Sequence, residues 1–316
     1  MRPPLGFVLV THTNPEQIVF LCRALSDKFG GAPIALHHDV SKCDLPFSQL
    51  PSNVSVVKNP VQTKWASITL VEAYLLSLRL LHETASPDWS VSLSAADYPA
   101  TTAERILGYL KRTRADALMD FRELKIGVPE PADACSPGAT FHTPRYIESA
   151  YSRLVTPKLH NRIRRTLFGN NAKVHAEPKF IERWFTPFNE NFRPYAGDTW
   201  HTLNRRAAEV LLCKDEKANE LMHFYRRRFV PDEGYYQPIL LNTPGLRIEN
   251  NNRRFTIWEG SGNQSHPATI TASDVDAIAS SESHFARKFP FDLKLYRAMD
   301  EAIARQDAFG HSTGAP

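Results

Sequence analysis

The chain has 316 residues, of which 42% are hydrophobic and 23% charged, and its formal net charge at neutral pH is +4. This composition excludes a low-complexity or fibrous protein and is enough for one large globular domain or two smaller ones. No apolar run is long enough for a membrane-spanning helix, and the mild basic excess suits an anionic ligand without requiring nucleic acid.

The first 121 residues alternate between apolar runs typical of buried strands and segments with one apolar stripe typical of helices. Strands are expected at Gly6–Thr11, Pro33–Asp39, Val54–Val57, Trp89–Leu93 and Ala115–Phe121, and helices from Asn14 to Gly30, at Ser67–His82 and at Ala103–Arg112. This order predicts an α/β fold with a mostly parallel central sheet flanked by helices. Such sheets bind ligands at the carboxyl ends of their strands, where the sequence places Thr11, His12, Asp39, Ser94, Asp97 and Asp120.

Residues 122–190 are irregular in pattern, and their clearest element is the short basic amphipathic segment Lys158–Phe168. It is either a solvated basic helix face or a point of peripheral contact with an anionic membrane. From Tyr195 the pattern recovers, with strands expected after Tyr195 and at Leu246–Glu249 and Phe255–Trp258, and helices at Arg205–Leu212, Lys217–Arg228, Tyr235–Leu241, Ser273–Ser280 and Leu293–Gln306. Residues 307–316 are expected to be a disordered tail.

Cysteine usage and the N-terminus predict a cytoplasmic protein. The four cysteines, Cys22, Cys43, Cys135 and Cys213, are scattered without a CxxC pair, which favours free thiols in a reducing compartment over two disulfides. The first residues contain a short apolar core but no small-residue cleavage site, so they indicate a buried strand and not a signal peptide.

The stretch from Phe229 to Gln237, FVPDEGYYQ, holds two adjacent acids, Asp232 and Glu233, between a proline and a glycine. It can be a helix start in which Pro231 occupies the first position and the acids complement the helix dipole. It can also be a shaped catalytic turn that presents a carboxylate, and the two interpretations are compatible.

Common nucleotide and metal motifs are missing, because the chain has no GxxxxGK[ST] loop, no complete GxGxxG, no GxSxG and no HExxH. The single DxD pair, Asp274 and Asp276, follows Ser273 at an expected helix start, where its acids have a structural role. No metal site is therefore expected. Fixed cations could hold a diphosphate instead, and the candidates are Arg253, Arg254, Arg287 and Lys288.

Eight stretches occur in the order in which they occur in the core-2/I-branching β-1,6-N-acetylglucosaminyltransferase family, which includes the peptide O-xylosyltransferases. They are VTHTNPEQ, HHDVSK, KWASITLVEAYLLSL, WSVSLSAADYPATT, YAGDTWHTLNRRAAEVL, VPDEGYYQPILLN, RRFTIWEG and HFARKF. The chain resembles this family over nearly its whole length except about 122–190. The resemblance implies a GT-A-like fold and an inverting transferase that uses a UDP-sugar without a DxD metal site.

The resemblance also implies roles for individual residues. Glu233 matches the general base, Asp39 an acid near the uridine, Lys288 a lysine on the diphosphate, and Trp258 a tryptophan that lines the acceptor site. The phosphate-binding arginine of the family falls near Ala268, so Arg254 or Arg287 would have to replace it. The strand-end residues Thr11 and His12 are further candidates for nucleotide contacts, and the residues expected around the donor or acceptor sugar are Asp97, Trp200 and Asp232.

The predicted organisation is a single GT-A-like domain over residues 1–306. It comprises a nucleotide-binding half (1–121), a variable insert (122–190) and an acceptor or catalytic half (191–306). The predicted function is metal-independent transfer of a sugar, GlcNAc or xylose before others, from a UDP-sugar to a glycan or lipid-linked glycan in bacterial polysaccharide synthesis, with no nucleic-acid partner and no cofactor. Two alternatives remain open: a non-catalytic nucleotide- or carbohydrate-binding protein on the same fold, and a nucleotidyl- or sulfotransferase.

Overall fold

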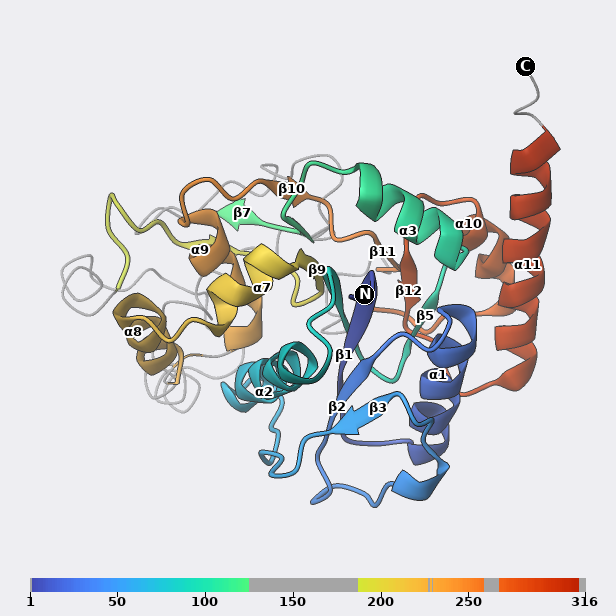
Figure 1. Cartoon of the computed structure of the whole chain (residues 1–316), viewed down its shortest axis with the longest axis horizontal. Coiled ribbons are helices and arrows are strands. Elements are labelled where there is room, and N and C mark those ends of the chain that lie inside the picture. Colours follow the sequence, from blue (N-terminus) through green and yellow to red (C-terminus); the bar gives the residue numbers. More distant parts are fainter. Residues whose placement is uncertain (1, 125–186, 227, 229, 259–266, 313–316) are drawn as a thin grey trace, which may run out of the picture. The chain divides into compact units, whose positions relative to one another are not determined.

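The computed structural model describes residues 2–124, 187–226, 228, 230–258 and 267–312 (Figure 1). The chain divides into two compact units that are interleaved in sequence. The first consists of Met1–Pro60, Leu76–Arg114 and Arg253–Pro316, and the second of Val61–Leu75 and Ala115–Asn252. The helix α2 (Thr69–Thr84) contributes residues to both.

The first unit is built on four parallel strands. They are β1 (Leu5–Thr11), β2 (Ile34–His38), β3 (Val54–Val56) and β4 (Trp89–Leu93). β1 lies between β2 and β4, and β3 pairs with the other edge of β2. The side chains of β2 are all buried and those of β1 nearly so, as expected for a parallel sheet covered on both faces.

A second, smaller sheet in this unit joins segments that are far apart in the sequence. Its strands are β5 (Asp97–Pro99), β11 (Arg254–Thr256) and β12 (Phe285–Arg287). β12 is central, antiparallel to β5 and parallel to β11. The late residues of the chain are thereby built into the same unit as the first strands.

The helices of the first unit complete its core. They are α1 (Pro15–Lys28), α3 (Ala103–Arg112), α10 (Val275–Ala279) and α11 (Leu293–Ser312), with short 3-10 helices at Phe47–Gln49 and Ala272–Asp274. α1 and α11 lie side by side in Figure 1, and the Gln17 amide donates a hydrogen bond of 2.8 Å to the Tyr296 hydroxyl. The Lys28 ammonium lies 2.8 Å from the Asp300 carboxylate, so an ion pair also joins α1 to α11.

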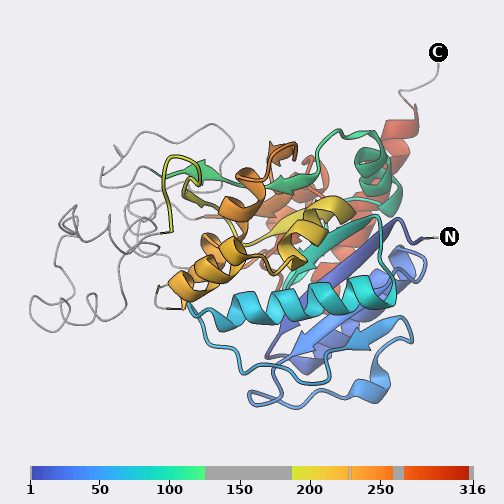
Figure 2. The ribbon, with the colours of Figure 1, turned by 60° about the vertical axis from the view of Figure 1, so that its left-hand side comes forward.

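The second unit has its own strands and helices. Its strands are β6 (Ala117–Met119), β7 (Arg122–Glu123), β8 (Tyr195–Ala196), β9 (His201–Asn204) and β10 (Ile248–Asn250). Its helices are α7 (Arg205–Leu212), α8 (Glu216–Tyr225), the 3-10 helix Pro231–Glu233 and α9 (Tyr236–Leu241). β6 is parallel to β10 and antiparallel to β9, β7 pairs antiparallel with β8, and α7 packs near α9 (Figure 2).

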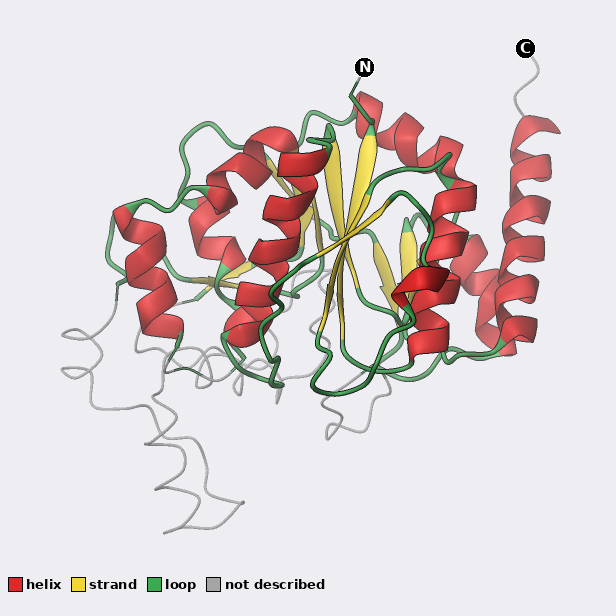
Figure 3. Cartoon of the chain, turned by 60° about the horizontal axis from the view of Figure 1, so that its bottom comes forward, coloured by secondary structure: helices red, strands yellow, loops and turns green. Residues whose placement is uncertain are grey.

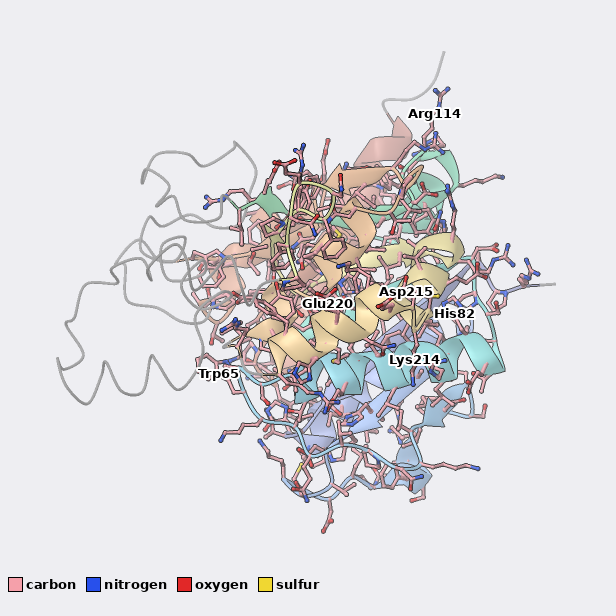
Figure 4. All side chains as sticks on the ribbon, turned by 90° about the vertical axis from the view of Figure 1, so that its left-hand side faces the viewer. Trp65, His82, Arg114, Lys214, Asp215 and Glu220 are labelled. Carbon is pink, nitrogen blue, oxygen red and sulfur yellow. The ribbon has the colours of Figure 1, made fainter. Side chains whose placement is uncertain are left out.

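Two helices of this unit begin at the side-chain caps that their sequences provide. The Asn204 side chain accepts a hydrogen bond from the Ala207 N–H at the start of α7. Asp215, labelled in Figure 4, accepts one from the Ala218 N–H at the start of α8. Such caps satisfy backbone donors that have no partner inside the helix.

The α/β class and the mostly parallel sheet are confirmed, and Figure 3 shows the alternation of strands and helices. The expected division into a half ending at 121 and a half starting at 191 differs from the two units, because residues 253–306 belong with the first strands. α11 continues to Ser312, so the expectation of a disordered tail from 307 is wrong for residues 307–312.

Three local predictions also need correction. The loop expected at SAADYP contains the strand β5. The cap expected at Ser273 is formed by Thr271, whose backbone N–H and hydroxyl both donate to Asp274 in a capping box. Asn14 precedes α1 in a left-handed conformation and makes no side-chain cap. Among the described residues, no helix combines the length and the apolar character needed to cross a membrane.

Candidate active site

The carboxyl ends of β1 and β2 bring Thr11 and Asp39 together in the first unit. Thr11 lies opposite His38 in the parallel register, and the Asp39 N–H donates to the Thr11 carbonyl at 3.0 Å. The Asp39 carboxylate is buried, and its Oδ1 accepts hydrogen bonds from the N–H and the hydroxyl of Ser41 at 3.1 and 2.6 Å. This acid is therefore held in one orientation at the end of the sheet.

His38, which the sequence did not single out, connects the two strand ends. Its Nε2 donates to the Cys43 carbonyl at 2.8 Å, since a carbonyl oxygen can only accept. In the neutral imidazole this leaves Nδ1 to accept from the Thr11 hydroxyl at 3.0 Å. The loop that carries Asp39 and Ser41 is thus held to β1 at both of its ends.

His12, the next strand-end candidate, is exposed. Its pKa lies below the usual value, first because of partial desolvation and then because of the positive charge of Lys42. A neutral imidazole at this position can donate or accept a hydrogen bond, but it does not supply a positive charge for a phosphate.

The cation pair expected at the diphosphate follows from β12. Arg287 is the last residue of that strand and is partly buried, whereas the side chain of Lys288 is exposed. The Ile270 N–H donates to the Lys288 carbonyl at 2.9 Å and the Phe289 N–H to the Ala96 carbonyl at 2.8 Å. The backbone that follows the pair is therefore fixed on its carboxyl side.

Arg254 is held differently, because its side chain is inside the unit and only 5% exposed. Its Nη2 donates to the Ser92 carbonyl at 2.9 Å, and its guanidinium lies 4.9 Å from the centre of the Phe285 ring. Burial, with the charges of Arg254 and Arg253, lowers the pKa of His284 to about 3. This placement argues against Arg254 as the replacement for the missing arginine and leaves Arg287 as the candidate.

Asp97 was expected at the donor or acceptor sugar, but its side chain is fully buried. Its partners are Ser94 and Arg287. The burial is incompatible with a direct contact to a sugar, and the role of this acid has to be sought through Arg287.

Glu233 lies in the second unit, at the end of the 3-10 helix Pro231–Glu233. Its carbonyl accepts a hydrogen bond of 2.9 Å from the Gly197 N–H. Val230, immediately before Pro231, has a left-handed backbone with φ +52°, and its N–H donates to the carbonyl of Ala66, which is also left-handed. Two segments distant in sequence thus hold the turn that presents Glu233.

The backbone around Gly197 is unusually close to its neighbours. A Cβ atom added at this position would lie 1.8 Å from the Asp120 carbonyl oxygen and 2.9 Å from the Gln237 amide nitrogen. The Gln237 amide donates to the Asp198 carbonyl at 2.9 Å, and the Asn252 N–H donates to Asp120 Oδ1 at 3.0 Å. The sequence alone did not identify these residues as contacts that hold the Glu233 turn. The glycine in the YAGDTW stretch was the feature of the sequence that pointed to them.

The carboxyl oxygen Oδ1 of Asp232 is buried and has no hydrogen-bond partner within the described parts of the chain. Burial raises the pKa of Asp232 to about 6, although its own backbone N–H opposes this. Asp232 does not cap the following helix, since α9 starts at Tyr236 without a side-chain cap. The pKa of Tyr236 is raised by burial and then by the charge of Asp232, so the two groups are neighbours.

The two expected tryptophans lie in different units. Trp200 precedes β9 in the second unit and Trp258 follows β11 in the first, and both are partly buried. The structure therefore groups Thr11 with Asp39 and Asp97 with Arg287 in the first unit, and it places Asp232, Glu233 and Trp200 in the second. The expected membrane contact at Lys158–Phe168 lies outside the described residues.

Within the described ranges, no three His, Cys, Asp or Glu side chains are grouped so that they could hold a metal ion. Both acids of the DxD pair have structural partners, because Asp274 forms the capping box with Thr271 and Asp276 lies 3.0 Å from Arg305. Three cysteines, Cys22, Cys43 and Cys213, are free thiols, and Cys135 is not among the described residues.

Parallel strands with polar side chains at their carboxyl ends give the first unit the α/β architecture in which ligands commonly bind at this edge. Sequence comparison gives the family. Residues 7–127 and 142–280 match the model of the Core-2/I-Branching enzymes, and the chain belongs to this family.

The chain is similar to curated proteins that are named transferases. Xylosyltransferase 1 of Rattus norvegicus is 25% identical over 266 residues, covering 80% of this chain and 28% of the relative, and Xylosyltransferase 1 of Homo sapiens is 26% identical over 267 residues, covering 80% and 24%. Beta-glucuronosyltransferase GlcAT14A of Arabidopsis thaliana is 23% identical over 230 residues, covering 71% and 44%. The chain thus spans about a quarter of the length of the xylosyltransferases.

A solved structure, that of S. aureus TarS 1-349, aligns with 98% of this chain and 74% of its own at 11% identity and a TM-score of 0.31. This score is too low to bear on the fold.

Proposed function

We propose that this protein is an inverting glycosyltransferase that moves a sugar from a UDP-sugar to a hydroxyl of a glycan or lipid-linked glycan. The observation that carries the proposal is the turn at Glu233, whose carbonyl is held by the Gly197 N–H in a chain of the Core-2/I-Branching enzyme family. The names of the relatives support transfer of a sugar. Polysaccharide synthesis in a bacterium is the proposed setting.

In the proposed reaction the Glu233 carboxylate takes the proton of the acceptor hydroxyl. The acceptor oxygen forms a bond to the anomeric carbon while the bond from that carbon to the UDP oxygen breaks on the opposite face, which inverts the configuration. A general base of this kind contributes about 10²–10⁴-fold to the rate.

The leaving UDP takes the electron pair of the broken bond, so its diphosphate gains negative charge. Arg287 and Lys288 are the proposed partners of this charge, since cations fixed in place stabilise it without reorganising. Asp39 is proposed to contact the uridine, and Thr11 and His12 to line the same strand ends. With these cations the reaction is proposed to need no metal ion.

The test of the proposed base is Glu233→Gln, which keeps the shape of the side chain but cannot accept the proton. We expect UDP-sugar transfer to fall at least about a hundredfold while UDP binding, measured by calorimetry, stays within about twofold. Glu220→Gln, on the exposed part of α8 (Figure 4), is the matched control and should leave both unchanged. A Glu233→Gln protein with more than half of the wild-type rate would remove Glu233 from this role.

The donor is to be found by thermal-shift measurements with UDP-xylose, UDP-GlcNAc and UDP-glucuronic acid, followed by transfer assays with and without EDTA. We propose UDP-xylose or UDP-GlcNAc as the donor. Binding of UDP-sugars without transfer or slow hydrolysis of any of them would instead indicate a non-catalytic binding protein.

A further inference from the structure

Asp97 and Arg287 face each other across the small sheet of the first unit. β5 and β12 are antiparallel, and their register places Asp97 directly opposite Arg287. Asp97 Oδ1 lies 3.9 Å from Arg287 Nε, with the Asp97 side chain 0% and the Arg287 side chain 16% exposed. The pair therefore runs from the interior of the unit towards its surface.

The two oxygens of the Asp97 carboxylate have different surroundings. Oδ2 accepts hydrogen bonds from the Ser94 N–H at 2.7 Å and from the Ser94 hydroxyl at 2.5 Å. Oδ1 is buried and has no hydrogen-bond partner in the described part of the chain, so Arg287 is its counter-charge. Because a buried carboxylate is stable only with compensating charge or hydrogen bonds, Ser94 fixes the rotation of this acid and Arg287 neutralises it.

The ion pair with Asp97 restricts the side chain of Arg287, which lies at the position proposed to bind the diphosphate. Arginine has many rotamers in solution, and ordering it requires a partner that is itself fixed. Asp97 is such a partner, because the strand register sets its backbone and Ser94 sets its carboxylate. The exposed Lys288 follows directly, so the restrained guanidinium and the exposed ammonium are neighbours in the chain.

We propose that Asp97 is a positioning residue that orients the Arg287 guanidinium for binding the diphosphate of the nucleotide donor. Asp97 itself does not touch the donor. The inference rests on the proposed function, in which Arg287 binds the leaving diphosphate. The charge of Asp97 alone would have the opposite effect on UDP binding, because a carboxylate near a diphosphate repels it. A loss of UDP affinity on neutralising Asp97 therefore indicates orientation of Arg287, whereas a gain of affinity indicates charge repulsion.

The test compares UDP with uridine, which lacks the diphosphate, in calorimetric titrations of the wild type, Asp97→Asn, Arg287→Ala and the double variant. We expect Asp97→Asn to weaken UDP binding about tenfold and to leave uridine binding unchanged. We expect Arg287→Ala to weaken UDP binding at least as much, and the double variant to bind UDP no more weakly than Arg287→Ala. Such non-additivity is the mark of two residues that act through one contact.

Two control variants separate the orientation of Arg287 from a general loss of negative charge. Asp88→Asn removes an exposed acid of the same unit and should change neither titration. Ser94→Ala keeps the charge of Asp97 but removes a hydrogen bond that orients it, and it should weaken UDP binding through Arg287 even where Asp97→Asn does not fold.

Several outcomes would overturn the proposal. UDP binding that is unchanged in Asp97→Asn would show that the acid does not orient Arg287, and tighter binding would show that it acts by charge repulsion. An equal loss of uridine binding would show a general effect on the unit, and a further tenfold loss in the Arg287→Ala background would show that Arg287 is not the route. If the wild type binds neither UDP nor uridine, the proposed function fails; if it binds UDP independently of Arg287, only the present inference fails.

Discussion

Asp232 and Glu233 are adjacent in the sequence, and each turns one carboxyl oxygen into the interior. The Gly197 N–H holds the carbonyl of Glu233, and burial raises the pKa of Asp232 to about 6. A carboxyl group with this pKa is protonated over part of the physiological pH range. The sequence could name the pair but could not separate its members, because burial depends on the tertiary structure.

The raised pKa of Asp232 predicts how stability depends on pH. The folded state binds the Asp232 proton more tightly than the unfolded state, so the stability that this proton contributes is present below pH 4 and is lost as the pH rises to about 6. Asp232→Asn should therefore raise the free energy of unfolding by about 2–3 kcal/mol at pH 8 and much less at pH 4.

Urea unfolding of both proteins between pH 4 and pH 8 measures this difference. Asp44→Asn, at an exposed position of the first unit, is the control for loss of an acid. A gain that is the same at every pH would contradict the assignment, because it would not follow the titration of a carboxyl group.

Arginine illustrates the limit of residue-level prediction. Arg254 and Arg287 were equal candidates in the sequence, since both lie beside another cation and near aromatic residues. The structure separates them by burial and partners: Arg254 is fixed to the Ser92 carbonyl and the Phe285 ring, whereas Arg287 reaches the surface beside Asp97. No local sequence pattern distinguishes an arginine whose side chain is buried from one whose side chain reaches the surface.

At the scale of elements, close backbone approach at Gly197 supports the Glu233 turn. Gly197→Ala should lower the free energy of unfolding by about 3 kcal/mol or more, because the new Cβ would overlap the Asp120 carbonyl group. It should also lower sugar transfer, since the Gly197 N–H holds the Glu233 carbonyl. Denaturant unfolding and a transfer assay measure the two effects.

The matched control is the same substitution in α3. A Cβ added at Gly108 would meet only the end of the flexible Arg112 side chain, at 3.3 Å. Gly108→Ala should therefore stabilise the protein by about 0.5–1 kcal/mol, as alanine does inside a helix. Equal effects of the two substitutions would show that the contact at Gly197 does not constrain the turn.

Elements with a strong periodic pattern were predicted well, and elements defined by distant pairing were not. The strand Trp89–Leu93 and the helices Ala103–Arg112 and Arg205–Leu212 have the predicted bounds. β5 was missed because three residues that include a proline have no period of their own, and they form a strand only by pairing with β12, far along the chain. The shift of a cap from Ser273 to Thr271 has a similar origin, since both residues can cap a helix.

At the scale of the whole molecule, the family resemblance of the sequence is confirmed. The two halves predicted along the sequence, 1–121 and 191–306, do not coincide with the two compact units. Residues 253–316 join the first strands in one unit, and residues 61–75 join the second. A composition or periodicity argument has no access to this interleaving, because it depends on which strands pair.

The interleaving predicts the behaviour of a chain ended at Asn252. This protein would retain the whole second unit but lose β11, β12, α10 and α11 from the first. It would also lose Tyr296 and Phe289, which accept the hydrogen bonds of the Gln17 amide. We expect the first unit to unfold and UDP binding to be lost.

Hydrogen exchange of the β1 amides measures unfolding of the first unit, and UDP titration measures the loss of UDP binding. A chain ended at Ser312 is the control. Adding the separate fragment 253–316 should restore part of the protection. Native-like protection of β1 in the chain ended at Asn252 would contradict the division into units.

The left-handed backbone of Val230 has a further consequence for the order in which the protein becomes competent. A left-handed conformation costs about 1–2 kcal/mol for a residue other than glycine, and it persists only where surrounding contacts impose it. At Val230 one such contact is the hydrogen bond to the Ala66 carbonyl, and the turn that follows depends on the Gly197 N–H. The position of Glu233 therefore depends on both distant segments, and we expect local unfolding of either one to displace the proposed base.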